Sequence, residues 1–588
     1  MTLAARSYRV AAIQFEPMLF EKASNLRRLL ALTNEAVENG ARLIVHPEMA
    51  NVGYCWQSRD EIAPHVEPIP GPTTELFADV AARSKTYIVT GLAEVAPDTG
   101  IFYNSAVLIG PDGAVGVYRK THSYISEPKW AKDGDLGIPV FETELGRIAM
   151  IICMDATFFE PARIAALQGA DVICFPTNWL SEKSPSPVWM ARAYENDAYL
   201  IPANRYGLER GVQFSGGSCV IDPDGAVQDV VDTGDGIVYG QIDLTRIQAD
   251  RLAGRRPECY GNLTLNSYLW HPSEFHDLYD LRPLPKGRTS MIAVAQMSPV
   301  VPGVELNLDR IEATADANPE ADLIVFPELT LSGLVRDRIG DEQIAETIPG
   351  KATKRLTQIA AANGTYLVVG LIERADETLY NSAVLVGPEG VVGTYRKLHL
   401  SPTDQVWSAP GDLGLPTFDT HIGRIGLQIG HDVNFPEAAR CLALDGADLI
   451  AWPSSCGEPP VRGWGSTSVP HLPHVQTGPT DCHFHLWRER SKENCTYVAF
   501  ANDPTTGMGW SGIFAPTVEG EPVSESLLPG PAEGVIILKM DTTNLDCRYV
   551  TNYARAKDLL GMRAPIWYDP LQVRASTTAS RCVTVANH

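Results

Sequence analysis

The chain has 588 residues, of which 44% are hydrophobic and 20% charged, a composition typical of a globular protein with more than one core. The formal net charge is −23 and no block of Lys and Arg is present, so we expect no nucleic-acid partner and no docking to an anionic membrane. No apolar run reaches transmembrane length and no secretion signal opens the sequence. The eleven cysteines, an odd number, are therefore expected to be reduced thiols in a cytoplasmic protein.

Short strands rich in β-branched residues alternate with amphipathic helices along the first part of the chain. The predicted strands are 10–14, 42–47, 87–95, 104–110, 148–154 and 171–177, and the predicted helices are 25–39, 72–84 and 158–169. Turns at 111–113 and 223–225 have the Pro-Asp-Gly composition of hairpin connections. This mixture indicates two sheets enclosed by helices rather than one doubly wound sheet.

The second half of the sequence repeats the first. RVAAIQFEP near the start returns as MIAVAQMSP, and GRIAMIICMD returns as GRIGLQIGHD. The number of residues between matched positions of the two copies hardly changes along the chain. It is 280 for Glu48 and Glu328, and 277 for Asp155 and Asp432. Such constant spacing predicts two copies of one domain. We place the copies at 1–283 and 290–575, a linker at 284–289 and a tail at 576–588.

Cys153 ends an apolar run that we predict to be a buried strand, and an amphipathic helix follows. Reacting groups of α/β folds stand at this place, and the positive end of the next helix favours a thiolate. A lone cysteine is more often inert packing. However, Glu48 in HPEM and Lys120 in YRKTH also follow apolar stretches. A carboxylate, an ammonium and a thiol are what thioester chemistry on an amide or nitrile requires.

On these three motifs the chain resembles the nitrilase, or carbon–nitrogen hydrolase, superfamily over nearly its whole length, twice. The resemblance implies an α/β fold, a four-layer αββα sandwich in each copy, and a Glu-Lys-Cys triad. Glu48 would be the general base, Lys120 would stabilise the oxyanion, and Cys153 would be the nucleophile. The backbone N–H of Met154 would share the oxyanion with Lys120. The resemblance implies no cofactor and no metal.

A second glutamate of the family corresponds to Glu127, seven residues after Lys120 in KTHSYISEPKW, although a loop glutamate could equally be solvated. Tyr54, Trp130 and Trp179 are candidate walls of a substrate pocket, with ordinary packing as the alternative for each.

The second copy lacks the nucleophile. Gly430 stands where Cys153 stands, while Glu328 and Lys397 remain and Asp404 replaces the second glutamate. We expect this copy to form no acyl-enzyme and to serve as a scaffold. The two copies would then make a pseudo-dimer within one chain, with further association into a homo-oligomer left open.

Between residues 454 and 488 the second copy carries an insertion rich in potential metal ligands. They are His471, His474, Cys482, His483 and His485. Their spacing matches no zinc pattern, so we expect a surface loop or an interface arm rather than a metal site.

The motifs indicate hydrolysis of a small carboxamide to the acid and ammonia, because Cys153-Met154-Asp155 resembles the Cys-x-Asp of amidases. Nitrile hydrolysis is the first alternative, favoured by the surroundings of Glu127. Hydrolysis of an N-carbamoyl amide is less expected, because Ala156 and Thr157 stand where that group carries paired arginines. The predicted partner is thus a small amide or nitrile. A catalytically silent binding protein is the alternative from another class.

Overall fold

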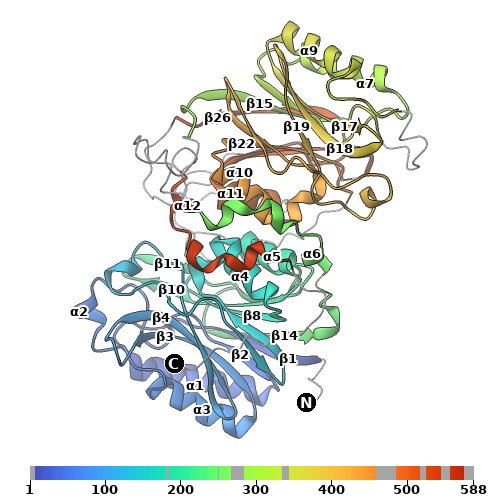
Figure 1. Cartoon of the computed structure of the whole chain (residues 1–588). Coiled ribbons are helices and arrows are strands. Elements are labelled where there is room, and N and C mark those ends of the chain that lie inside the picture. Colours follow the sequence, from blue (N-terminus) through green and yellow to red (C-terminus); the bar gives the residue numbers. More distant parts are fainter. Residues whose placement is uncertain are drawn as a thin grey trace.

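The computed structural model describes residues 7–180, 184–248, 250–265, 284–333, 344–457, 485–506, 508–516, 525–543 and 557–574. Two similar halves lie one above the other and meet through helices (Figure 1). Among these described residues, each half contains two six-stranded sheets. The first half adds a two-stranded ribbon of β10 (Tyr206–Glu209) and β11 (Val212–Ser215).

The two large sheets of the first half are mixed, with parallel strands at their centres. The first has the order β14-β1-β2-β3-β4-β5, in which β1, β2 and β3 are parallel. The second has the order β13-β12-β9-β8-β7-β6, in which β7, β8 and β9 are parallel. The central strands are short and buried, as expected for strands covered on both faces. The strands are β1 (Ser7–Gln14), β2 (Leu43–Val45), β3 (Tyr87–Val95), β4 (Phe102–Gly110), β5 (Gly113–Arg119), β6 (Val140–Thr143), β7 (Gly146–Met150), β8 (Val172–Thr177), β9 (Tyr199–Asn204), β12 (Ser218–Ile221), β13 (Val227–Val231) and β14 (Gly236–Asp243).

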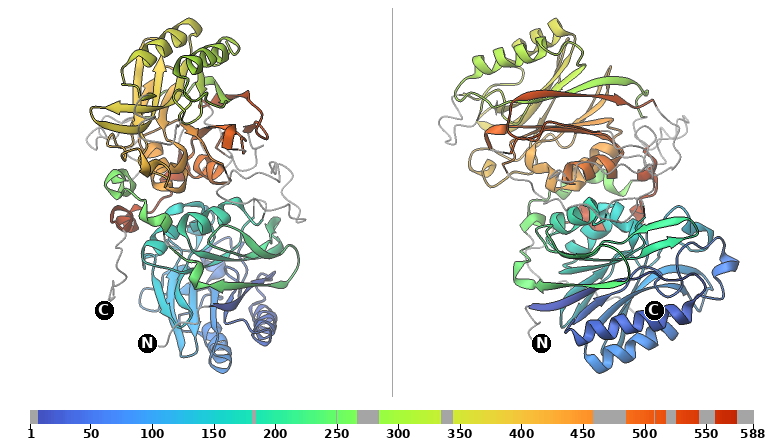
Figure 2. Two further views of the ribbon diagram at one scale, coloured as in Figure 1. Left: turned by 90° about the vertical axis from the view of Figure 1, so that its right-hand side faces the viewer. Right: turned by 180° about the vertical axis from the view of Figure 1, so that it is seen from behind.

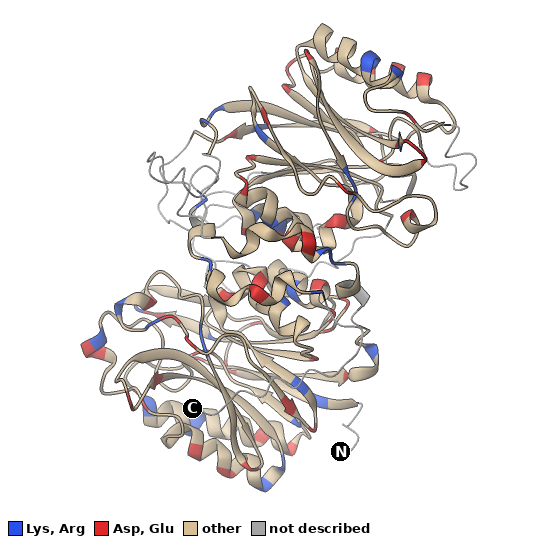
Figure 3. Ribbon diagram, in the orientation of Figure 1, with Lys and Arg blue, Asp and Glu red and all other residues tan. Residues whose placement is uncertain are grey.

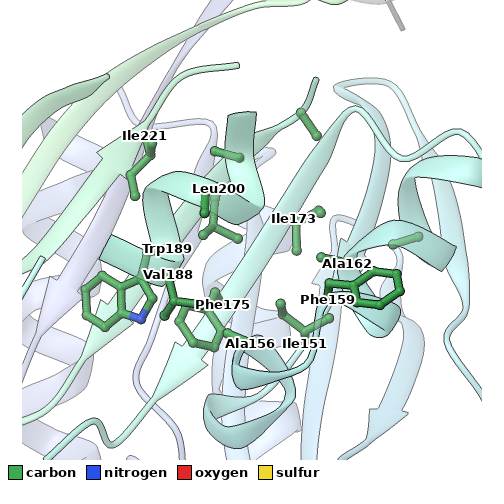
Figure 4. Packing of buried hydrophobic residues seen from close by; sticks show 14 of the residues in the cluster. Ile151, Ala156, Phe159, Ala162, Ile173, Phe175, Val188, Trp189, Leu200 and Ile221 are labelled. Carbon is green, nitrogen blue, oxygen red and sulfur yellow. The ribbon is translucent and has the colours of Figure 1, made fainter. Parts of the chain in front are cut away.

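Helices cover the outer face of each sheet, so the half has four layers in the order helix, sheet, sheet, helix (Figure 1). Leu29 and Phe77 anchor α1 and α3 on the first sheet. Phe159 and Trp189 anchor α4 and α5 on the second, where they pack against strand residues such as Leu200 (Figure 4). Each such buried side chain contributes about 1.5–3 kcal/mol. The helices of this half are α1 (Lys22–Glu38), α2 (Arg59–Ile62), α3 (Pro72–Ser84), α4 (Phe159–Leu167), α5 (Pro187–Asn196) and α6 (Asp250–Ala253).

The second half repeats this plan, with sheets in the orders β19-β18-β17-β16-β15-β26 and β20-β21-β22-β23-β24-β25. Helices α7 and α9 cover its outer face, and α10 and α11 face the first half (Figure 1). The elements are β15 (Thr289–Gln296), α7 (Val304–Asp316), β16 (Leu323–Val325), α9 (Lys351–Asn363), β17 (Tyr366–Ala375), β18 (Thr378–Gly387), β19 (Gly390–Arg396), β20 (Thr417–Thr420), β21 (Gly423–Leu427), α10 (Pro436–Leu444), β22 (Leu449–Ser454), α11 (His485–Asn494), β23 (Tyr497–Asn502), β24 (Gly512–Phe514), β25 (Glu525–Leu527), β26 (Gly534–Asp541) and α12 (Asp558–Gly561).

The halves join through α5 and α11, with α4 and α10 beside them (Figures 1 and 2). Four buried charges form a closed ring there. Arg192 and Arg490 each pair with both Glu195 and Glu493, and all four N–O distances are 2.6 Å. Figure 3 shows acidic and basic residues side by side on the helices at this junction. Each arginine pairs once within its own helix and once across the junction, which gives the junction an approximate two-fold symmetry.

Each half also extends an arm onto the other half. We define the first arm as residues 250–265, which pack on α10, and the second arm as residues 557–574, which pack on α4. Tyr260 of the first arm bonds His399 at 2.6 Å, and Tyr568 of the second arm bonds His122 at 2.8 Å. In Figure 1 the second arm, in red, lies against the first half. The arms therefore cross between the halves.

The predicted fold class is confirmed: two tandem αββα sandwiches form a pseudo-dimer within one chain. Helix α3 has the predicted bounds, and α1 begins three residues before the predicted start. The predicted domain limits, 1–283 and 290–575, stay predictions. Most of the 454–488 insertion, including four of its five potential metal ligands, lies outside the described residues. Within the described ranges, no helix is long and apolar enough to cross a membrane.

Candidate active site

Glu48 follows the short strand β2, at the edge where the parallel strands of the first sheet end. Gly91 allows the backbone around Glu48 to lie close against strand β3. A Cβ at Gly91 would lie 2.6 Å from the Pro47 carbonyl oxygen and 2.7 Å from the Glu48 Cα. The Glu48 side chain is fully buried, and its Oε1 accepts a hydrogen bond from Asn104 Nδ2 at 2.6 Å. A larger side chain at position 91 would displace Glu48.

Lys120 directly follows β5, and its ammonium lies between two carboxylates. Its Nζ donates to Glu48 Oε1 at 2.9 Å and to Glu127 Oε1 at 2.5 Å. Glu127 begins a short 3-10 turn and is 1% exposed, so it is not a solvated loop residue. Its Oε1 also accepts from the Tyr54 hydroxyl at 2.5 Å. The structure thus brings Glu48, Lys120 and Glu127 into one buried cluster.

Cys153 lies in a tight turn rather than on a strand. The prediction of a strand through Cys153 is wrong, because β7 ends at Met150 and a 3-10 turn begins at Cys153. The Ile152 N–H donates to the Asp155 carboxylate at 2.8 Å instead of to a neighbouring strand. Cys153 has φ +42°, in the left-handed region that few residues other than glycine adopt. Strained turns of this kind carry nucleophiles at the ends of strands in other hydrolases.

Asp155 joins the Cys153 turn to the segment that carries Lys120. Its Oδ2 accepts from the Ile152 N–H, and its Oδ1 accepts from the His122 backbone N–H at 3.0 Å. The His122 Nδ1 lies 2.9 Å from the same Oδ1. One buried carboxylate therefore fixes the relative position of the thiol and the ammonium.

Burial and the neighbouring charges together decide the resting protonation states of Cys153 and Lys120. Burial, and after it the Glu48 carboxylate, raises the pKa of the Cys153 thiol, while Lys120 acts in the opposite direction. The expectation that the next helix favours a thiolate stays a prediction; α4 begins at Phe159, one residue after its predicted start. Burial would lower the pKa of Lys120, but the Glu127 and Glu48 carboxylates raise it well above its usual value. Cys153 therefore rests as a thiol and Lys120 as an ammonium.

Several buried polar atoms of the cluster have no hydrogen-bond partner among the described residues. They include Glu48 Oε2, Glu127 Oε2 and Asn104 Oδ1. Unpaired buried polar atoms are costly, and catalytic function is one reason that proteins retain them. Glu48 Oε2 is thus available to accept a proton from a nearby donor. Burial also raises the pKa of Glu127 to about 7, although Lys120 opposes this shift.

The three predicted pocket aromatics are all buried and lie in two clusters. Tyr54 and Trp130 belong to one hydrophobic cluster, whereas Trp179 belongs with Cys153 to the main core cluster. Their roles in substrate binding stay predictions, as does the oxyanion role of the Met154 N–H. Among the residues that the structure describes, no three His, Cys, Asp or Glu side chains form a group suited to a metal ion.

The second half keeps the framework of this site without the thiol. Gly430 has φ +39°, close to the value of Cys153, and begins the same kind of turn. Lys397 Nζ donates to Glu328 Oε1 at 2.7 Å. Glu328 Oε2 accepts from the Ser455 N–H at 3.0 Å, whereas the equivalent oxygen of the first half has no partner among the described residues. The acid of the second half is therefore already bonded on both oxygens.

Sequence reasoning missed three residues that support the first site. They are Gly91, Asn104 and His122, which recur in the second copy as Gly370, Asn381 and His399. Each is a glycine or a polar residue retained at the same place in both copies, within or just after an apolar strand. That repetition is the signal that could have identified them.

Comparison with known proteins identifies the family of the chain. The carbon–nitrogen hydrolase family matches residues 9–252 and 291–541. The chain belongs to the carbon–nitrogen hydrolase family. It is 37% identical over 246 residues to a nitrilase of Pyrococcus abyssi, covering 42% of this chain and 93% of that protein. It is 30% identical over 255 residues to an omega-amidase of Mus musculus, covering 41% and 90% respectively.

Among solved structures, an amidase from Nesterenkonia sp. is similar to this carbon–nitrogen hydrolase, with a TM-score of 0.38 and 24% identity. The match covers 45% of this chain and 97% of the amidase. Each relative thus corresponds to about one half of the chain. Since the relatives include proteins named nitrilase, omega-amidase and formamidase, membership of the family gives the type of bond that is cleaved but not the substrate.

Proposed function

We propose that the first half hydrolyses a small carboxamide through a thioester on Cys153, releasing the carboxylic acid and ammonia. The observation that carries the proposal is the buried cluster of Glu48, Lys120 and Glu127, whose charges act on a thiol held in a strained turn. The Cys-x-Asp sequence and the similarity to an omega-amidase and a formamidase support an amide as the substrate.

Acylation begins with attack of Cys153 Sγ on the amide carbon. Because the pKa of this thiol is raised, Glu48 must take its proton during the attack rather than before it. The carbonyl electron pair moves to oxygen, where Lys120 and the Met154 N–H stabilise the negative charge. When the carbonyl forms again, the C–N bond breaks. The leaving nitrogen takes the proton from Glu48 and departs as ammonia.

Deacylation uses the same groups. Glu48 takes a proton from a water molecule as its oxygen attacks the thioester carbon. Lys120 again stabilises the oxyanion, and the C–S bond breaks as the intermediate collapses. Sγ takes back the proton from Glu48, so the thiol is restored and the carboxylic acid leaves. Glu127 keeps the Lys120 ammonium in place throughout.

Nitrile hydrolysis is the second candidate. The 37% identity to a nitrilase and the sequence around Glu127 favour it. In this reaction Sγ adds to the nitrile carbon and the nitrogen gains a proton, which gives a thioimidate. Water then releases ammonia to leave the thioester, and a second water releases the acid.

The test is ammonia release by the purified full-length protein from aliphatic amides and from nitriles of the same carbon skeletons. We expect turnover of amides and a loss of at least about 10³-fold in Cys153→Ser. Cys259→Ser, which changes a half-buried thiol of the first arm, is the matched control and should retain activity. Turnover of nitriles alone would reverse the order of the two candidates. Activity that survives Cys153→Ser would refute both, and inactivity on every substrate would favour a silent binding protein.

A further inference from the structure

We propose that Tyr568, a residue of the second half, positions the nucleophile of the first half through His122 and Asp155. The Tyr568 hydroxyl lies 2.8 Å from His122 Nε2, and His122 Nδ1 lies 2.9 Å from Asp155 Oδ1. Asp155 Oδ2 in turn accepts from the backbone N–H that directly precedes Cys153, at 2.8 Å. A continuous chain of buried hydrogen bonds thus links the second arm to the catalytic turn. The proposal rests on the proposed hydrolysis at Cys153.

One placement of protons satisfies every member of this chain. The Asp155 carboxylate accepts, so His122 carries its proton on Nδ1 and its Nε2 accepts from the Tyr568 hydroxyl. The Tyr568 oxygen accepts in turn from the Ala564 N–H at 3.1 Å. Burial, helped by the Glu160 carboxylate, raises the pKa of Tyr568, so its hydroxyl retains the proton that it donates. Asp155 therefore fixes the tautomer of His122, and Tyr568 holds the ring in its orientation from the other side.

The second arm also packs on the turn itself. Met154, directly after Cys153, forms a buried cluster with Phe158 and with Leu559 of the second arm. The His122 ring stacks on Phe158 with 4.4 Å between ring centres. A residue at φ +42° keeps that conformation only where its surroundings hold it. Part of those surroundings belongs to the second half.

The chain contains a matched control, because equivalent hydrogen bonds link the first arm to the turn at Gly430 in the second half. Tyr260 of the first arm bonds His399 at 2.6 Å, and His399 Nδ1 lies 2.6 Å from Asp432. Asp432 accepts from the backbone N–H that precedes Gly430, at 2.8 Å. Tyr260 and Tyr568 therefore have equivalent structural roles. The turn linked to Tyr568 carries a thiol, whereas the turn linked to Tyr260 carries a glycine.

The experiment compares Tyr568→Phe with Tyr260→Phe in the full-length protein. Each variant loses one equivalent buried hydroxyl, so both should show a similar decrease in Tm. We expect kcat of Tyr568→Phe to fall about tenfold or more with KM nearly unchanged, because small displacements of a reacting group cost rate rather than binding. Tyr260→Phe should keep the kcat of the wild type. Equal losses of kcat in the two variants, or no loss in either, would overturn the proposal.

Alkylation of Cys153 by iodoacetamide, followed against pH by mass spectrometry of the peptide, provides a readout that needs no substrate. Tyr568→Phe should shift this pH profile, whereas Tyr260→Phe should leave it unchanged. If the wild type releases no ammonia from any substrate, the proposed function fails while this comparison still tests the positioning role. Identical profiles in all three proteins would refute that role. The pair His122→Gln and His399→Gln repeats the comparison one bond closer to the turns if a tyrosine variant does not fold.

Discussion

The Glu328 carboxylate lies against Gly430, at the place where the side chain of a nucleophile would begin. A Cβ on Gly430 would be 2.5 Å from Glu328 Oε2 and 3.4 Å from Lys397 Nζ. The Ser455 N–H bonds the same Oε2. In the first half Cys153 has a Cβ at this place, so the Glu48 carboxylate cannot lie as close to it as the Glu328 carboxylate lies to Gly430.

Restoring a thiol to the second half should not restore activity. A cysteine at Gly430 would clash with the Glu328 carboxylate, which is held by a backbone N–H and by Lys397. We therefore expect the double variant Cys153→Ala/Gly430→Cys to release ammonia no faster than Cys153→Ala alone. Turnover by the double variant above that of the single variant would contradict this expectation.

We expect Glu48, the acid of the first half, to be required for turnover, and Glu328, the acid of the second half, not to be required. Glu48→Gln removes the proposed base while retaining the shape of the side chain, and we expect kcat to fall about 10²–10⁴-fold. Glu328→Gln makes the same change in the second half and should leave kcat unchanged. Steady-state ammonia release measures both variants. A large loss in Glu328→Gln would mean that the second half takes part in the reaction.

Activity should decrease as the pH is lowered through about 7. Burial raises the pKa of Glu127 to about 7, so below this pH the carboxyl gains a proton and no longer balances the charge of Lys120. A profile of kcat/KM from pH 5 to 9 should therefore show an acid limb near 7. Glu127→Gln, which resembles the protonated form, should have low activity and no such limb. Asp404→Asn in the second half is the control and should keep the wild-type profile.

Breaking the charge ring at the junction should destabilise the whole chain. Arg490→Met leaves Glu195 and Glu493 buried with one arginine between them, and such losses cost about 3–5 kcal/mol. Lys351 forms an ion pair with Glu305 on the surface, so Lys351→Met should leave the free energy of unfolding nearly unchanged. Urea unfolding of the two variants measures the difference, and similar small effects would contradict the prediction.

Stability should also fall as the pH rises, because of Glu489 on α11. Burial raises the pKa of this carboxyl from 4.5 to about 8, so the folded chain retains a proton that the unfolded chain releases. Between these values the free energy of unfolding should fall by up to about 1.4 kcal/mol per pH unit. Glu489→Gln should reduce this slope, and Glu305→Gln at the surface should not. Urea unfolding at pH 5, 6, 7 and 8 is the measurement.

The internal repeat made the fold and much of the site predictable. Glu48 and Lys120 follow strands of the first sheet and Cys153 follows strand β7 of the second, each after an apolar stretch, and reacting groups of α/β folds stand at such strand ends. The replacement of Glu127 by Asp404 was also visible, and Lys397 bonds Asp404 at 2.7 Å. Patterns of period two or 3.6 describe strands and helices, but not the φ of a single turn residue. The sequence therefore predicts a strand through Cys153, whereas in the structure strand β7 ends at Met150 and a turn begins at Cys153.

The crossed arms were not predicted, because hydrophobic periodicity does not say which half a segment packs on. The bond between His122 and Tyr568 joins residues 446 apart in the chain. A signal was nevertheless present, since Arg-x-Pro-x-x-Tyr-x-x-Leu occurs at 255–263 and again at 563–571. The first arginine of each motif pairs with a glutamate of the other half, Arg255 with Glu437 at 2.6 Å and Arg563 with Glu160 at 3.0 Å.

The crossing of the arms also bears on the history of such a gene. After two copies are fused, one copy can lose its nucleophile by a single codon change without altering the other copy's surroundings. Deleting that copy is a different event, because it would also remove the segment that covers α4 and bonds His122. A fused chain can therefore lose the catalytic activity of one copy far more easily than it can lose that copy altogether.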